Sequence, residues 1–205
     1  MMRKIIQYIL LLVTLPLIML QAQENNLVLL FNTGISIPSI PDRFSNNWLA
    51  GFNGGIGIGY QLSTKSQLIF NVNYNYHLFD KDSYLEQIGE GNSNLGFEGG
   101  STSIITAYII SKAIFSPSRI VSPYLNLGVG YMNISKSNTT LNLFSETFTI
   151  KGKSFGVFSL VGGVGVSIAV SDILALFAEA NYNVGFSKEE ITGFIPIKLG
   201  LAIKL

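Results

Sequence analysis

The sequence predicts an all-β protein, an eight-stranded antiparallel up-and-down transmembrane β-barrel preceded by a cleavable signal peptide. The first observation is the end of the chain, where aliphatic residues occupy every second position from Ile195 to Leu205. This period of two indicates a strand with one wholly apolar face. The second is that charged residues make up only 12% of the chain, against about 25% in soluble domains. The third is that alternating segments recur with Gly, Asn and Ser on their polar faces, which favours an exterior that faces lipid.

The N-terminus has the layout of a secretory signal peptide. Arg3 and Lys4 precede a mostly apolar stretch that ends at Leu20, and the small residue Ala22 marks the predicted cleavage point. A retained membrane helix needs about 20 apolar residues, and this stretch is shorter. We therefore expect a signal peptide over residues 1–22 and a single barrel domain over residues 23–205.

The first half of the mature chain contains four predicted strands. The first ends before Pro38, and the second carries Gly at most positions of one face, where small side chains suit the inside of a narrow barrel. The third alternates large apolar residues with Asn71, Asn73, Asn75 and His77. In the fourth, both faces are apolar in places. We place Ile105, Ala107, Ile109 and Ala113 outward and Thr106, Tyr108 and Lys112 inward. These predicted strands are 27–37, 48–62, 67–79 and 101–115.

The second half contains four more. The fifth and sixth oppose Leu, Val and Ile with Gly, Asn and Ser, and the seventh places Glu179 on its inward face. The segment from Phe155 to Val170 is nearly all apolar, but a helix of that length is short for a membrane span. The predicted strands are 123–134, 153–170, 173–186 and 194–205.

The connections between these strands broadly alternate between long and short, as outer-membrane barrels require. The long ones are expected on the external side, with both termini on the opposite, periplasmic side. A soluble lipocalin-type barrel has the same strand count, but its water-facing side would carry many more charges. The predicted external loops are 38–47, 80–100, 135–152 and 187–192.

Several outward aromatic residues lie near predicted strand ends, where they would form girdles at the two membrane interfaces. These residues are Trp48, Tyr60, Tyr74, Tyr76, Tyr131, Tyr182 and Phe186.

The inward charges predict a polar network inside the barrel. If the loop 187–192 closes a regular hairpin, Glu179 lies opposite Gly200 and diagonal to Lys198, within reach of a long side chain. A buried charge without a partner is costly, so we expect Glu179 to pair with Lys198, with Lys112 as a further member. Pro196 cannot donate a ladder hydrogen bond, and we expect a bulge or frayed pairing there.

The signal peptide, the last strand and two internal motifs together resemble a known family. The motifs are Pro123-Tyr124-Leu125-x-Leu127-Gly128-x-Gly130-Tyr131 and Ser171-Asp172-x-Leu174-x-Leu176. The chain is similar to the small eight-stranded outer-membrane β-barrels of diderm bacteria, such as the OmpA transmembrane domain and OmpX. This resemblance implies an outer-membrane location and recognition by the barrel-assembly machinery. The family's terminal assembly signal would correspond to Lys198, Gly200, Ile203 and Leu205, although many members end on Phe.

The sequence gives little indication of a catalytic, metal or cofactor site. Its single histidine, His77, would need a nearby serine and acid to act as a base, and Ser83 and Glu86 are the candidates in the next loop. The acidic residues of that loop lack a defined calcium-binding pattern. There is no Cys, no cofactor motif and no metal-ligand spacing, so we expect no enzyme, no cofactor and no metal. A net charge of +1 without a basic run gives no reason to expect nucleic acid.

The interior of an eight-stranded barrel is about filled by its own side chains. The sequence therefore predicts a structural or surface-interaction protein in contact with outer-membrane lipid. An extracellular ligand would bind at loops 80–100 and 135–152. The alternatives are a narrow porin-like channel, suggested by the Gly and Asn interior, and a lipid-modifying barrel enzyme.

Overall fold

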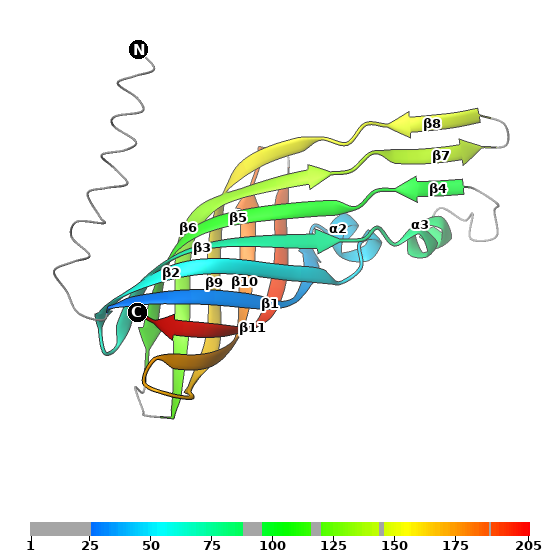
Figure 1. Cartoon of the computed structure of the whole chain (residues 1–205). Helices are drawn as coiled ribbons and strands as arrows, with labels where there is room; N and C mark the ends of the chain where they lie inside the picture. Colours follow the sequence, from blue (N-terminus) through cyan, green and yellow to red (C-terminus); the bar gives the residue numbers. More distant parts are fainter. Residues whose placement is uncertain (1–25, 88–95, 116–119, 144–145, 189) are drawn as a thin grey trace, which may run out of the picture.

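The computed structural model describes residues 26–87, 96–115, 120–143, 146–188 and 190–205. The predicted signal peptide, residues 1–22, lies outside these ranges. Eight antiparallel strands close into a barrel in the spatial order β1-β11-β10-β9-β6-β5-β3-β2, which confirms the predicted fold class (Figure 1). They are β1 (Leu27–Ile40), β2 (Gly51–Ser63), β3 (Ser66–His77), β5 (Thr102–Ile114), β6 (Val121–Lys136), β9 (Ser154–Ala169), β10 (Leu174–Phe186) and β11 (Ile191–Lys204).

The barrel closes because the first strand pairs with the last. Strands β1 and β11 pair antiparallel from Val28↔Lys204 to Ile40↔Gly193. The amide of Leu205 donates to the carbonyl of Leu27 at 2.9 Å, which ties the two ends together. A closed sheet leaves no unpaired edge, and a chain without such edges can cross a lipid bilayer.

The side chains alternate between the lumen and the exterior as predicted. Along β5, Ile105 and Ile109 are about half exposed, whereas Thr106 and Tyr108 are fully buried, which confirms the phase assigned to this strand. Tyr108 fits inside because Gly130 lies beside it on β6, where a Cβ atom would collide with the tyrosine ring. The exterior is therefore aliphatic and aromatic, and the interior mixes Asn, Ser, Thr and Gly with buried apolar residues.

Three of the four predicted external loops contain regular structure. The first loop starts after Ile40 rather than at Pro38 and forms helix α2 (Asp42–Asn47), and the loop after β3 forms helix α3 (Lys81–Gln87).

Ser83 donates hydrogen bonds to Asp80 from its hydroxyl and its amide, and these bonds hold the pKa of the Asp80 carboxyl below its ordinary value. No helix in the described part of the chain is long and apolar enough to cross a membrane.

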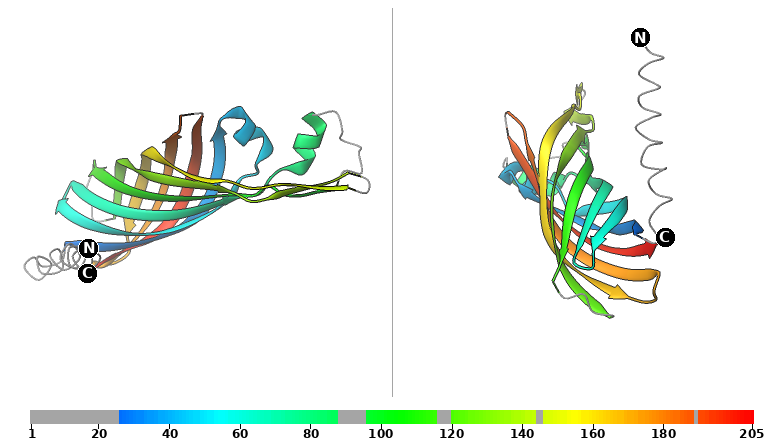
Figure 2. Two further views of the ribbon diagram at one scale, coloured as in Figure 1. Left: turned by 90° about the horizontal axis from the view of Figure 1, so that it is seen from above. Right: turned by 90° about the vertical axis from the view of Figure 1, so that its left-hand side faces the viewer.

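A second sheet extends the barrel wall beyond these helices (Figures 1 and 2). It consists of β4 (Gly96–Gly99), β7 (Thr139–Leu143) and β8 (Glu146–Ile150) in the order β4-β7-β8. These strands continue the neighbouring barrel strands β5, β6 and β9, so one side of the wall projects past the rest. The segments predicted as loops at 80–100 and 135–152 therefore contain short strands, because neighbouring segments there pair with each other through their backbones.

The irregularity expected at Pro196 occurs on one side only. Pro196 pairs in regular register with Ser36 of β1, and no bulge interrupts that ladder at this point. Toward β10, pairing is interrupted between Ala180↔Ile197 and Asn183↔Phe194 and then resumes without a shift in register. Because proline has no backbone N–H to donate, strand pairing is lost locally, but the register of the two strands is unchanged.

Candidate functional site

A buried ion pair lies across the middle of the barrel. Lys198 Nζ is 3.0 Å from Glu179 Oε1, and the two side chains are only 4% and 10% exposed. Asn181 donates to the same oxygen at 2.9 Å, and Tyr124 and Asn126 donate to Oε2 at 3.1 and 3.0 Å. Removing two charges from water is expensive unless their remaining hydrogen-bonding capacity is met, and here both carboxylate oxygens are engaged.

The pair forms through a different register from the predicted one. Glu179 lies directly opposite Lys198, and Gly200 lies opposite Phe177. The prediction placed Glu179 opposite Gly200 because it assumed a six-residue loop. The loop is shorter, since β11 already begins at Ile191 and pairs there with Phe186. Gly200 instead makes room for the ring of Phe177, which a Cβ atom would strike.

Lys112 joins the network through an aromatic ring. Its Nζ lies 3.9 Å from the centroid of the Tyr124 ring, and the hydroxyl of that tyrosine donates to Glu179. The sequence did not predict Tyr124, Asn126 and Asn181 as members of this network. The signal that could have found them is the inward phase of their strands combined with the register that places Asn126 opposite Lys112 and Gly163.

An apolar plug closes the loop end of the lumen. It consists of buried residues from α2, β5, β6, β9 and β11, with Trp48 packed against them. The ring of His77 lies 5.3 Å from that of Phe44 and 6.1 Å from that of Phe194, so this polar residue is also covered. The buried members of the plug are Phe44, Ile104, Met132, Ile134, Val157 and Phe194.

Trp48 was predicted as an outward girdle residue of the second strand, and the structure corrects this. It precedes β2, and its indole Nε1 donates to the carbonyl of Gly100 at 2.9 Å. Its ring contacts Phe44 on one side and Phe79 on the other, at 5.7 and 5.0 Å between centroids. Residues 48–50 therefore precede strand β2, which begins at Gly51.

A second apolar cluster packs inside the lumen, next to the ion-paired residues. Leu30, Tyr108, Val161 and Phe177 belong to a buried apolar cluster that also includes Ile69 and Ile110. A hollow of about 230 Å³ opens at the terminus end of the barrel, and Lys112, Tyr124 and Phe177 are among the residues that line it. The plug, the ion-paired layer and this cluster thus each fill part of the lumen.

Outward aromatic residues concentrate toward the loop end. Phe158 and Phe186 are opposite each other on β9 and β10 and stack at 6.5 Å, and Tyr131 of β6 lies opposite Phe158. Tyr74 and Tyr76 stack on β3, and the hydroxyl of Tyr182 is 3.4 Å from that of Ser39. Tyr60 lies at the other end, opposite Leu27. The role of these residues at the membrane interfaces stays a prediction.

The residues of the predicted assembly signal all lie on or next to β11, within its paired region. Lys198 points inward to Glu179, and Ile203 pairs with Leu29 of β1. Recognition of Lys198, Gly200, Ile203 and Leu205 during assembly stays a prediction.

The structure does not assemble the catalytic group considered for His77. Its ring nitrogens lie 3.3 Å from Ser36 Oγ and 3.4 Å from the carbonyl oxygen of Leu49, and the ring contacts the plug. Ser83 bonds to Asp80 outside the barrel instead. Within the described ranges, no three His, Cys, Asp or Glu side chains gather as they would around a metal ion.

A groove of about 1080 Å³ lies at the loop end, beside the plug. Its described lining includes five basic side chains and one acidic side chain, Glu190. The groove reaches from the mouth of the barrel, at Val157 and Thr192, to the outward rings of Phe158 and Phe186. The basic residues are Arg43, Lys136, Lys151, Lys153 and Lys188.

A closed antiparallel barrel with an apolar exterior and a polar, side-chain-filled lumen is the architecture of a transmembrane β-barrel. The chain belongs to the family described as the outer membrane protein beta-barrel domain, whose profile matches residues 10–195. No curated protein matches the sequence.

Solved outer-membrane barrels share the fold. Neisserial surface protein A superposes with a TM-score of 0.55 at 19% identity, over 87% of this chain and 97% of that one. The N-terminal barrel of Pseudomonas aeruginosa OprF gives 0.52 at 15% identity, over 89% and 100%. A major outer membrane protein of Thermus thermophilus gives 0.57 at 11% identity, over 89% and 100%. At these identities the likeness shows the fold alone.

Proposed function

We propose that this protein is a closed, non-enzymatic outer-membrane barrel that acts through the surface at its loop end. The observation that carries the proposal is the filled lumen, in which Phe44 and Phe194 of the plug lie above the Glu179–Lys198 pair. A barrel filled at successive levels offers solutes no path, whereas its projecting sheet offers partners a surface outside the membrane.

The glycine positions favour a closed barrel over the narrow channel that the sequence also suggested. Glycines lining a lumen would leave space for water only if neighbouring side chains left that space empty. Instead, a Cβ atom at Gly55 would collide with Asn73, one at Gly163 with Asn181, and one at Gly165 with the ring of Tyr124. The small residues thus accommodate large polar neighbours.

In this proposal both termini are periplasmic and the sheet β4-β7-β8 lies outside the cell. The two ends of the barrel are distinguished by their connections, because a tight turn joins β2 to β3 at the terminus end, while the helices and the extra sheet lie at the other. Outer-membrane barrels place short turns in the periplasm and long connections outside. A surface partner would then meet the described parts of segments 80–100 and 135–152.

The orientation is testable by labelling, because the chain contains no cysteine. We expect Thr149→Cys, on the exposed β8, to react with a membrane-impermeant maleimide on intact cells. The matched control, Lys65→Cys in the exposed β2–β3 turn, should react only after the outer membrane is opened. Labelling of Lys65→Cys but not of Thr149→Cys on intact cells would show the opposite orientation.

A further inference from the structure

The wall of the barrel has a notch between β9 and β10 at the loop end. Pairing of β9 with β10 ends at Phe158↔Phe186, whereas pairing of β9 with β6 continues to Ser154↔Ser135. Residues 154–157 of β9 therefore have a strand partner on one side only. The hairpin between β10 and β11 turns back at residues 187–190, where Ser187 and Glu190 hydrogen-bond to each other.

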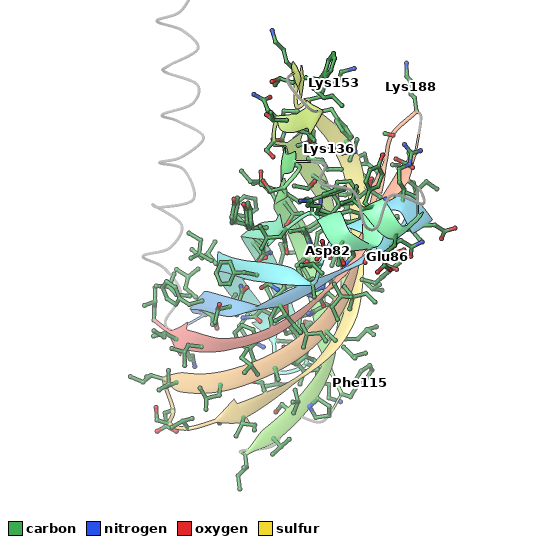
Figure 3. All side chains as sticks on the ribbon, turned by 90° about the vertical axis from the view of Figure 1, so that its right-hand side faces the viewer. Asp82, Glu86, Phe115, Lys136, Lys153 and Lys188 are labelled. Carbon is green, nitrogen blue, oxygen red and sulfur yellow. The ribbon has the colours of Figure 1, made fainter. Side chains whose placement is uncertain are left out.

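The basic groove occupies this notch. Lys151 and Lys153 precede β9 on one side, Lys188 lies in the hairpin on the other, and Arg43 of α2 also lines the groove. Figure 3 shows Lys153 and Lys188 at the tips of separate segments, with Lys136 below Lys153 and the acidic Asp82 and Glu86 on α3. Glu189 lies outside the described residues. Cations that line one groove from separate elements favour an anion.

The lower part of the groove is apolar and faces outward. Phe158 is 56% exposed and Phe186 is 42% exposed, and their stacked rings lie on the exterior of the barrel just below the cations. A soluble anion would gain nothing from these rings. A membrane lipid with a phosphorylated headgroup would place its phosphate among the cations and an acyl chain against the aromatic pair.

We propose that this notch binds the phosphorylated headgroup of a membrane lipid, with an acyl chain along Phe158 and Phe186. The proposal rests on the proposed function for the position of the loop end at the membrane surface. It adds a ligand class and a site that the closed barrel alone does not require.

The test compares two lipids that differ only in the phosphate. The full chain is folded into phosphatidylcholine nanodiscs that contain equal small fractions of phosphatidate and diacylglycerol with the same acyl chains. Lipids retained after transfer to detergent are counted by native mass spectrometry. We expect the protein to retain phosphatidate in preference to diacylglycerol.

Two variants and one control test whether the retained phosphatidate is bound at the notch. Each basic residue near an anionic lipid surface strengthens binding about fivefold, so Lys151→Gln, Lys153→Gln and Lys188→Gln together should weaken phosphatidate binding roughly a hundredfold. The control, Lys65→Gln, Lys81→Gln and Lys204→Gln, removes the same charge elsewhere and should leave binding unchanged. Phe158→Ser with Phe186→Ser should also reduce retention. Folding of every variant is checked by circular dichroism.

Three outcomes would overturn the proposal. The first is equal retention of the two lipids by the wild type, and the second is equal loss in the notch variant and its lysine control. The third is a wild type that retains no phosphatidate but binds a sulfated polysaccharide, with this binding lost in the lysine variant and kept in the phenylalanine variant. That result would assign the groove to a soluble polyanion. Because nanodisc binding does not depend on orientation in the cell, its failure is distinguishable from failure of the cysteine labelling.

Discussion

Replacement of Lys198 by Met is expected to lower the free energy of unfolding by about 3–5 kcal/mol, the usual cost of breaking a buried pair. The substitution keeps most of the side-chain volume but leaves the Glu179 carboxylate inside the barrel without its cation. The remaining donors, Tyr124, Asn126 and Asn181, hydrogen-bond to the carboxylate without neutralising it, and the nearby Lys112 lies over the Tyr124 ring rather than in an ion pair with Glu179. The measurement is urea unfolding of the folded protein in lipid vesicles, followed by circular dichroism.

Lys204→Met is the matched control, because Lys204 occupies the same inward phase of β11 but is exposed at the barrel end. It should change the free energy of unfolding by less than about 0.5 kcal/mol, as surface substitutions usually do. Adding Glu179→Gln to Lys198→Met should restore part of the loss, since it removes the unpaired charge. If Lys198→Met were as stable as the control, the ion pair would make no net contribution to the stability of the barrel.

The hydrogen bonds around Glu179 limit what a charge reversal can restore. Glu179→Lys combined with Lys198→Glu would preserve the pair as a pair of opposite charges. It would, however, place an ammonium group where Tyr124, Asn126 and Asn181 direct their donors. Partial rather than full recovery is therefore expected from this double variant.

Phe194→Ala is the second substitution with a large expected effect. Phe194 is fully buried in the plug, and removing a buried phenylalanine side chain costs about 3–5 kcal/mol through lost burial and the cavity left behind. The same vesicle unfolding experiment measures it. We also expect the variant to remain non-conducting, because the Glu179–Lys198 layer still crosses the lumen.

Phe52→Ala is the control for this substitution, since Phe52 is 55% exposed on the outside of β2. It should reduce stability by less than Phe194→Ala, because its site can be refilled by lipid. Equal losses in the two variants would mean that the plug residues pack no better than the exterior ones.

Much of the fold could be predicted because the relevant signals are local. The alternation of side chains along each strand fixes which residues face the lumen, as Thr106 and Tyr108 of β5 show. The inward placement of Glu179 and Lys198 follows from the same period. Even the projecting sheet left a signal, since residues 147–150, Thr-Phe-Thr-Ile, alternate as a strand does.

What could not be predicted depends on contacts distant in sequence or on the exact length of a turn. The β10–β11 register depends on a four-residue loop in which the Ser187 hydroxyl accepts a hydrogen bond from the Glu190 amide, and a composition of Ser, Lys and Glu does not specify that length. The inward position of Trp48 depends on Phe44 and Phe79, which flank it in space. The plug likewise brings a short loop helix against four barrel strands, which strand periodicity alone cannot indicate.

Conductance across a planar lipid bilayer shows whether the lumen is closed. The full chain is folded, inserted and held at a constant voltage, with insertion verified by recovery of the folded protein from the bilayer lipids. The filled lumen predicts a current no different from that of the protein-free bilayer. Stable unitary steps of uniform size would contradict it and would establish a channel through the barrel.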